Sequence, residues 1–268
     1  MIANATLADQ LAAAAREAAD AILRVVREGF DVERKGDDSP VTRADRAAEA
    51  VILDALGRHA PGVPVIAEEQ AAAGHIPAHG DTFFLVDPLD GTKEFVRGGD
   101  DYTVNIGLIE QGVPTLGVIQ VPATGQLFAG RVGQGAWRET EGGRDAMAVR
   151  AWPDLPVAVT SKSHLSASTL AYLEATMRSG FQRTGIGSSL KFCLLAEGRA
   201  DIYPRLSPTC EWDTAAGHAI LSAAGGQVDG PDGRPLAYGK RKFFNPGFLA
   251  ATRPGQVPIE AYFDPPGS

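Results

Sequence analysis

FFLVDPLDGT, residues 83–92, places an apolar strand directly before two carboxylates, Asp87 and Asp90. Pro88 stiffens the turn between them, and Gly91 permits an unusual backbone conformation. Chemistry in α/β proteins is commonly placed at such strand ends. Mg²⁺ prefers hard oxygen ligands and usually takes a few carboxylates together with water and substrate phosphate. The segment therefore predicts a magnesium site. An ordinary turn is the alternative, because aspartate and glycine beside proline are common turn formers.

Two further groups of this segment could take part in such a site. The backbone carbonyl of Leu89 could supply another oxygen to an ion, and the hydroxyl of Thr92 could orient a water molecule. If a helix begins at Gly91 or Thr92, its free N–H groups would face a phosphate.

Acidic residues elsewhere in the chain strengthen the prediction. Glu68 and Glu69 end a predicted strand, where an adjacent acidic pair is costly unless it is solvated or neutralised by a cation. Asp213 stands at the start of an alanine-rich helix, where an ordinary N-cap is the alternative. Asp45 follows Thr42 at another helix start, where the alternative is a first-turn acid favoured by the helix dipole.

The residues before the segment predict two helices. Apolar residues recur at three- and four-residue spacing over 7–25, which predicts an amphipathic helix that ends near Gly29. A second helix is expected after Thr42. The charged stretch between them, ERKGDDSPVT (33–42), predicts an exposed loop or a hairpin, and residues 63–66 predict a short strand.

The residues after the segment predict first strands and then an alternation of strands and helices. Four apolar runs separated by turn signals are typical of consecutive antiparallel strands: FFLV, VNIGLIE, TLGVIQV and QLFAGRV. Beyond the polar stretch ETEGGRDA, strands alternate with helices near 165–178, from Ser188 and from Asp213. We therefore expect an α/β (α+β) protein of two fused lobes. Residues 1–150 would carry the antiparallel sheet and most metal ligands, and residues 151–268 would form an α/β lobe with Asp213 and the specificity residues.

Composition narrows the class of protein. The chain has 268 residues, 44% of them hydrophobic, and 33 acidic against 25 basic residues give a formal net charge of −8. This balance disfavours nucleic acid polymers as partners. Cys193 and Cys210 are too few for a disulfide framework and are expected to be free thiols. No apolar run resembles a secretory signal or a transmembrane segment. A cytoplasmic protein is expected, with peripheral association at a membrane left open.

Three motifs together resemble a known superfamily. AEE (67–69), DPLDGT (87–92) and WDTAAG (212–217), in this order and spacing, are similar to the metal-site motifs of the inositol monophosphatase superfamily. That superfamily includes fructose 1,6-bisphosphatases and bisphosphate nucleotidases. The resemblance covers nearly the whole chain, from VTRADRAAEA to NPGF, and implies the layered α-β-α-β-α sandwich of the sugar phosphatases.

Longer matches are similar to one branch of this superfamily. DPLDGTKEF, SKSH (161–164), GSSLKFC and CEWDTAAG resemble the bacterial 3'(2'),5'-bisphosphate nucleotidases. That branch removes the 3'-phosphate from adenosine 3',5'-bisphosphate and leaves AMP. The resemblance thus implies a small phosphorylated substrate and a magnesium-dependent phosphomonoesterase. The sequence leaves open whether the protein is a monomer or a homodimer.

The resemblance also implies a ligand set, carried over by position. Two Mg²⁺ ions are expected, with a third left open. Glu68, Asp87 and the carbonyl of Leu89 would bind one ion. Asp87, Asp90 and Asp213 would bind the second.

Catalytic and substrate-binding roles follow from the same resemblance. Thr92, paired with Asp45, would position and help to deprotonate the attacking water, with Glu68 also counted as catalytic. The amides of Gly91 and Thr92 would receive the phosphate. The positions implied for the nucleoside and a second phosphate are Ser188, Lys191, Arg205 and His164. For Lys191 the alternative is a solvated helix lysine, and for Arg205 it is a surface strand residue.

The mechanism expected is direct attack by water without a phosphoenzyme, because the nucleophile motif GxSxG, the P-loop and HExxH are all absent. A phosphate monoester dianion repels nucleophiles, so the catalyst must neutralise charge at both ends of the displacement. Two other functions remain open. One is an inositol or sugar phosphatase with the same metal site, and the other is a nucleotide-sensing relative without turnover.

Overall fold

Two long helices cover one face of the larger sheet in the computed structural model, which describes residues 2–34, 40–162 and 165–252. Helix α1 spans Ala5–Glu28, and α2 spans Arg43–His59. The side chain of Asn4 accepts a hydrogen bond from the amide of Leu7 and caps α1, and Gly29 ends it with positive φ. Both helices bury alanine, leucine and isoleucine along one stripe, as their apolar spacing predicts.

The larger sheet has seven strands in the order β3-β4-β5-β6-β7-β8-β9. All neighbouring strands are antiparallel except β3 and β4, which are parallel. The strands span Val65–Ala67 (β3), Thr82–Asp90 (β4), Thr103–Glu110 (β5), Val113–Gln120 (β6), Leu127–Arg131 (β7), Gly135–Thr140 (β8) and Gly143–Met147 (β9).

The smaller sheet has five strands in the order β11-β10-β12-β16-β14, and it mixes parallel and antiparallel pairs. Its strands span Val157–Ser161 (β10), Gln182–Ile186 (β11), Ile202–Arg205 (β12), Gln227–Asp229 (β14) and Phe248–Ala251 (β16). Shorter elements complete the fold: β1 (Val32–Arg34), β2 (Pro40–Thr42), α3 (Glu68–Ala72), α4 (Thr92–Val96), β13 (Thr209–Cys210), η1 (Arg241–Phe243) and β15 (Phe244–Asn245).

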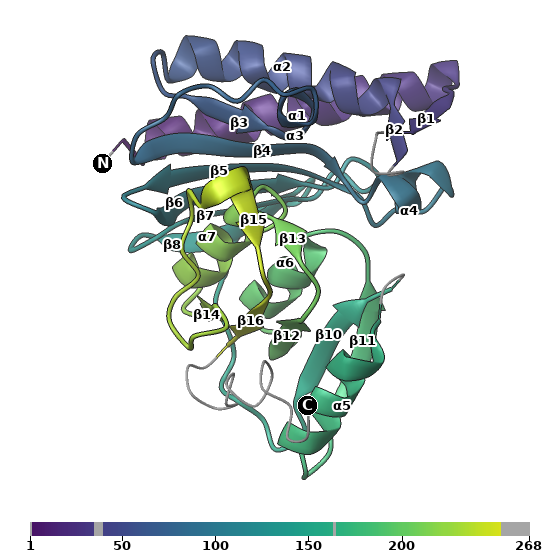
Figure 1. The fold of residues 1–268 in the computed structure, drawn as a ribbon, viewed down its shortest axis with the longest axis vertical. Helices are drawn as coiled ribbons and strands as arrows, with labels where there is room; N and C mark the ends of the chain where they lie inside the picture. The colour runs from purple at the N-terminus through teal and green to yellow at the C-terminus, as the bar shows by residue number, and fades with distance from the viewer. Residues whose placement is uncertain (1, 35–39, 163–164, 253–268) are drawn as a thin grey trace.

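Helices α6 (Leu190–Ala196) and α7 (Ala215–Ala223) lie between the two sheets, and α5 (Ala167–Thr176) covers the outer face of the smaller one. The alternation of side chains along each strand produces these layers. On β4, Phe84 packs toward α1 and α2 whereas Leu85 packs toward α6 and α7. The resulting order α-β-α-β-α, visible in Figure 1, confirms the expected sandwich.

Helix α7 lies unusually close to the larger sheet, over a row of glycines. Gly107, Gly117 and Gly130 stand next to one another across β5, β6 and β7. A Cβ atom at Gly107 would lie 2.7 Å from the Cβ of Ala215, and one at Gly130 would lie 2.7 Å from the Cα of Ile220. Only glycine at these positions therefore allows α7 to pack this close to the larger sheet. The packing also fixes the position of the first turn of α7 relative to the sheet.

The structure confirms most of the expected elements, adds strands in one polar stretch and moves two helix starts. The predicted hairpin is present as β1 and β2, which pair on either side of residues 35–39. The polar stretch at 139–146, for which the sequence predicts no particular element, contributes to β8 and β9. The helix expected from Ser188 begins at Leu190, and the one expected from Asp213 begins at Ala215.

Both cysteines are free thiols, as expected. Within the described ranges, no helix is long and apolar enough to cross a membrane. The division of the chain into lobes of residues 1–150 and 151–268 stays a prediction. The larger sheet ends at Met147, and the smaller one begins at Val157.

Candidate active site

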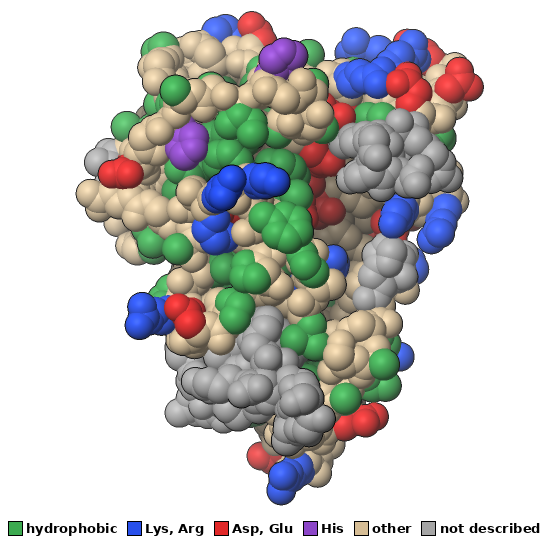
Figure 2. Space-filling model, viewed as in Figure 1, with side chains coloured by type: hydrophobic (Ala, Val, Ile, Leu, Met, Phe, Trp, Pro, Cys, Tyr) green, Lys and Arg blue, Asp and Glu red, His purple; other side chains and the backbone are tan. Residues whose placement is uncertain are grey.

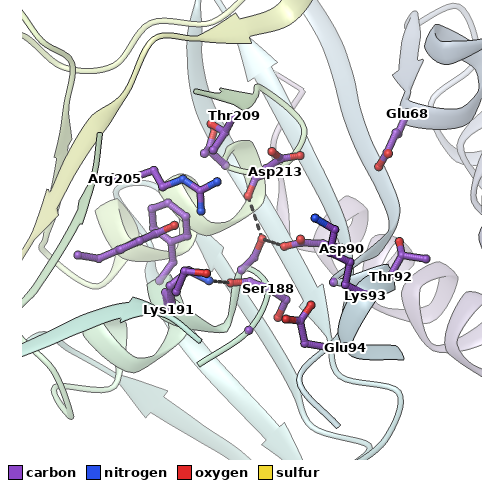
Figure 3. A pocket seen from close by; sticks show the side chains of 17 residues that line it. Glu68, Asp90, Thr92, Lys93, Glu94, Ser188, Lys191, Arg205, Thr209 and Asp213 are labelled. Atoms are coloured by element: carbon purple, nitrogen blue, oxygen red, sulfur yellow. Dashed lines mark hydrogen bonds between the residues drawn. The ribbon is translucent and has the colours of Figure 1, made fainter. Parts of the chain in front are cut away.

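Acidic and basic side chains from both halves of the chain meet in one cavity of about 310 Å³. Figure 2 shows the hollow on the face of the molecule, with acidic side chains in its depth. In Figure 3, Arg205 and Lys191 lie on one side, Glu68 and Thr92 on the other, and Asp213 with Asp90 between them. The cavity thus has one acidic side and one basic side.

The end of β4 presents its carboxylates through an irregularity in the sheet. Asp87 pairs with Asn105 and Asp90 pairs with Thr103, so β4 has one more residue than β5 between these two pairs. Such a bulge bends a strand and re-aims its side chains. Asp87 remains buried and accepts a hydrogen bond from the amide of Leu89 at 3.0 Å, whereas Asp90 lines the cavity.

Thr92 begins α4 and is held from two sides. Its hydroxyl lies 3.0 Å from the carbonyl oxygen of Leu89 and 3.3 Å from Oδ1 of Asp45. The other carboxylate oxygen of Asp45 accepts from the amide and the hydroxyl of Thr42, at 2.7 and 2.8 Å. Asp45 is therefore both the acid of a capping box at the start of α2 and a partner of Thr92.

The carboxylates of the cavity interact electrostatically. Burial raises the pKa of Asp87 well above its usual value, and the neighbouring charges of Glu68, Asp90 and Asp213 raise it further. Desolvation likewise raises the pKa of Asp213, followed by the charges of Asp90 and Glu68. Burial and the neighbouring charges thus disfavour ionisation of Asp87 and Asp213, so a divalent cation beside these two groups would offset a large electrostatic cost.

The donor set fits Mg²⁺ in chemistry, since every candidate ligand is an oxygen atom. Among the residues that the structure describes, however, no three acidic, histidine or cysteine side chains already form a group tight enough to hold an ion. Glu68 opens the short helix α3 rather than ending a strand, because β3 stops at Ala67. Its neighbour Glu69 donates a backbone hydrogen bond to Glu49 at 2.8 Å.

Asp213 lies one residue before the N-cap of α7. The cap position is occupied by Thr214, so the interpretation of Asp213 as an ordinary N-cap is wrong. Its carboxylate instead accepts a hydrogen bond from the amide of Cys210 at 2.9 Å, which closes a tight turn ahead of the helix. The side chain lines the cavity opposite Asp90.

Two polar residues without an assigned role in the sequence lie between these acids. The hydroxyl of Ser189 is 2.6 Å from Oδ2 of Asp90 and 2.8 Å from the carbonyl oxygen of Asp213. The side-chain amide of Asn105 donates to Ser189 at 2.9 Å and reaches Asp90 at 3.4 Å. The sequence gives only weak indications of their role. Ser189 stands in the motif GSSLKFC, and Asn105 is a polar residue within the apolar run VNIGLIE.

The basic side of the cavity carries Lys191 and Arg205, and Tyr203 lines the cavity with them. Lys191 is only 4% exposed, so the alternative of a solvated helix lysine is wrong. Its ammonium group donates to the carbonyls of Ile186 and Ser188 and lies 5.4 Å from the ring centre of Tyr203. Burial lowers the pKa of Lys191 to about 8, and burial raises the pKa of Tyr203 to about 12.

Gly91 and Ser188 meet where the two sides of the cavity touch. Gly91 has φ 91°, and a Cβ atom there would lie 2.8 Å from the carbonyl oxygen of Asp101 and 3.4 Å from Cβ of Ser188. Ser188 has φ 48°, a conformation that non-glycine residues seldom adopt, and this keeps it outside α6. The close approach explains why glycine precedes Thr92.

The structure thus brings together most of the residues singled out in the sequence. Those that line the cavity are Glu68, Asp90, Gly91, Thr92, Ser188, Lys191, Arg205 and Asp213. Three others lie just behind the residues that line the cavity: Asp87, Leu89 and Asp45. Asp45 and the carbonyl of Leu89 contact the hydroxyl of Thr92, and Asp87 accepts from the amide of Leu89 in the β4 bulge. His164 lies outside the described residues.

A family model and curated relatives match nearly the whole chain. The model of the Inositol monophosphatase family matches residues 3–255. The 3'(2'),5'-bisphosphate nucleotidase CysQ of Escherichia coli (strain K12) is 47% identical over 244 residues, which cover 90% of this chain and 97% of that protein.

Solved structures show the same fold. CysQ from Bacteroides thetaiotaomicron, described as a bacterial member of the inositol monophosphatase family, superposes with a TM-score of 0.78 at 36% identity. The alignment covers 92% of this chain and 98% of that one. An inositol monophosphatase from Anabaena (Nostoc) gives a TM-score of 0.72 at 27% identity, covering 96% of this chain and 98% of that one.

Proposed function

Because the chain belongs to the inositol monophosphatase family, we propose that it hydrolyses the 3'-phosphate of adenosine 3',5'-bisphosphate to AMP and phosphate. The observation that carries this proposal is the cavity, which joins the acidic side of Asp90 and Asp213 to the basic side of Lys191 and Arg205. The 47% identity to a 3'(2'),5'-bisphosphate nucleotidase over 90% of the chain supports the same substrate class.

Enzymes of this family are metal-dependent phosphatases, generally with Mg²⁺, and we propose two ions for this chain. Glu68, Asp87 and the carbonyl of Leu89 would hold one of them. Asp87, Asp90 and Asp213 would hold the other, with Asp87 shared. Bound there, such ions supply charge neutralisation for the phosphate and a lowered pKa for a water molecule.

The chain's own residues would position the attacking water. Thr92 donates its hydroxyl proton toward Asp45 or toward the carbonyl of Leu89, so the remaining lone pair of its oxygen can accept a hydrogen bond from water. Asp45 is buried and fixed by Thr42, which makes it a rigid acceptor for a proton passed through Thr92. The amides of Gly91 and Thr92, at the same edge, would receive a phosphate oxygen.

Lys191 and Arg205 would select a substrate that carries a second phosphate. Both line the same cavity as Thr92 and lie across it from that residue (Figure 3). A substrate with a single phosphate would not need these two cations, since the metal ions would already neutralise the charge of that phosphate. Ser188, at the start of the same segment, would contact the nucleoside.

A substrate panel tests the proposal. We expect catalytic efficiency to rank adenosine 3',5'-bisphosphate above inositol 1-phosphate and fructose 1,6-bisphosphate. Lys191→Gln is the matched variant, because it should reduce efficiency with the bisphosphonucleotide and leave inositol 1-phosphate little affected. If wild-type protein turns over inositol 1-phosphate faster than the bisphosphonucleotide, the substrate assignment is wrong and an inositol phosphatase takes its place.

Turnover itself separates an enzyme from a nucleotide-sensing relative. We expect Mg²⁺-dependent release of phosphate that is lost in Asp90→Asn. Asp54→Asn is the control, since Asp54 is exposed on α2 and pairs with Arg58 away from the cavity. Equal activity in wild type and Asp90→Asn would contradict the metal assignment. A cytoplasmic location and a monomeric or homodimeric state are proposed as well, and sedimentation of the purified protein distinguishes the two states.

A further inference from the structure

We propose that Ser189 is a positioning residue that clamps Asp90 and Asp213 into one metal-binding geometry. The inference rests on the proposed function, in which both acids bind the same ion. Neither acid is held by its own element alone, because Asp90 ends β4 and Asp213 precedes α7. The hydroxyl of Ser189 lies within hydrogen-bond distance of both segments, at the carboxylate of Asp90 and the backbone carbonyl of Asp213.

The distances identify Asp90 as the main acceptor of the Ser189 proton. A hydroxyl has one proton to donate, and the two acceptors of Ser189 lie at 2.6 Å, for Oδ2 of Asp90, and at 2.8 Å, for the carbonyl of Asp213. An O–H···O⁻ bond to an ionised carboxylate is typically about 2.5–2.7 Å long. The shorter distance therefore fits a charge-assisted bond to Asp90, and a rotation of the hydroxyl would instead direct the proton to the neutral backbone carbonyl of Asp213.

Asn105 fixes the orientation of this hydroxyl. Its side-chain nitrogen donates to the Ser189 oxygen at 2.9 Å and approaches the same Asp90 oxygen at 3.4 Å. The Asn105 side-chain oxygen is buried and finds no hydrogen-bond partner among the described residues. The amide cannot turn over, because that oxygen would then face the carboxylate of Asp90. Ser189 is therefore left with its proton directed toward the two acids.

The position of Ser189 in the chain gives this contact a further consequence. It is 2% exposed and lies immediately before α6, between Ser188 and the helix that carries Lys191. The clamp thus joins the proposed metal ligands to the segment that would bind the substrate. Without the hydroxyl, Asp90 would lose its shortest hydrogen bond, and the backbone carbonyl of Asp213 would lose its contact with Ser189. The charge repulsion between the carboxylates of Asp90 and Asp213 would remain.

Titration with Mn²⁺, followed by electron paramagnetic resonance of the free ion, tests this role without relying on activity. Partners that orient metal ligands typically contribute about tenfold to a hundredfold to metal affinity. We expect Ser189→Ala to lower the affinity for one of the two ions, the one held by Asp87, Asp90 and Asp213, by a factor of this size. The ion held by Glu68, Asp87 and Leu89 should be much less affected, and a merely structural role for Ser189 would not produce that selectivity.

Two more variants make the result decisive. Thr115→Val removes another buried hydroxyl, one that donates to Glu110 at 2.7 Å outside the cavity, and it should leave Mn²⁺ binding unchanged. Ser189→Cys keeps the shape of the side chain but donates only weakly, so it provides a folded test if Ser189→Ala is unstable. Wild-type affinity for both ions in a folded Ser189 variant would overturn the clamp. Absence of Mn²⁺ binding by wild-type protein would instead overturn the proposed function.

Discussion

Replacing Gly107 by alanine should displace the start of α7 and with it Asp213. The added Cβ would lie 2.7 Å from the Cβ of Ala215, whereas ordinary contacts begin at 3.4 Å. The helix must therefore retreat by about 0.7 Å, or the strand must bend by as much. Overpacking of this kind typically costs about 1–3 kcal/mol, which we expect as the loss in free energy of unfolding.

The same displacement should reduce turnover more than a stability loss alone can explain. Ala215 is two residues from Asp213, so the acid moves with the helix start. A misplacement of about 1 Å can cost about a hundredfold in rate, and we expect a tenfold to hundredfold fall in kcat for a shift of about 0.7 Å. Urea denaturation measures the first effect, and phosphate release at saturating Mg²⁺ measures the second.

Gly57→Ala is the matched control for this experiment. Gly57 lies in α2, where a Cβ atom would meet nothing within 4 Å. Because glycine inside a helix is less favourable than alanine, the control should gain about 0.5–1 kcal/mol in stability without a change in kcat. A Gly107→Ala protein with wild-type stability and wild-type kcat would refute the close packing of α7 as the feature that positions Asp213.

Three further predictions concern single residues. Burial lowers the pKa of Lys191 to about 8, so the lysine is charged below that pH and neutral above it. The ratio of kcat/KM between wild type and Lys191→Gln should therefore fall between about pH 7 and pH 10, and a constant ratio would contradict this. Thr92→Val removes the hydroxyl that contacts Asp45 and should lower kcat by about a hundredfold or more with an unchanged melting temperature, measured by phosphate release and calorimetry. Glu211→Gln should cost about 2 kcal/mol in urea denaturation, because this buried carboxylate accepts from the amides of residues 239–240 at 2.8 and 2.9 Å; full stability would show that the contacts are dispensable.

Local patterns were sufficient to predict most of the helices and strands, whereas the order of the layers followed from the resemblance to the family. The apolar spacing along 7–25 and the runs of β4 to β7 each bury one defined face, so helix and strand periods are visible without tertiary information. The hairpin of β8 and β9 lacks this signal. Residues 143–146 of β9 are all exposed, because the strand is at the edge of the sheet and has no core face to mark with apolar residues. Strand β9 pairs with β8 alone, so its place in the sheet depends on that neighbour and not on its own composition.

Helix starts near the cavity were misplaced for a common reason. Asp213 and Ser188 have the composition of cap residues, but each is held by a contact outside its helix. Asp213 bonds back to the amide of Cys210, and Ser188 adopts positive φ where it meets Gly91. A local turn at Asp213 and the close approach of a distant segment at Ser188 thus override the capping preference of these residues, in keeping with the general tendency of functional sites to break local rules.

The acids of the site were visible in the sequence because metal ligands of one chemical type stand beside strand ends and turns. The residues that arrange them were not, because their role exists only across long separations in the chain. Ser189 is 99 residues from Asp90 and Asn105 is 84 residues from Ser189. The row of glycines under α7 could not be recognised from the sequence for the same reason, since Gly107 matters only because Ala215 packs against it. Two independent contacts therefore determine where Asp213 lies: the sheet sets the depth of its helix, and Ser189 sets its distance from Asp90. A protein with the same acidic motifs but a bulkier residue at either position would retain the ligands and lose the geometry.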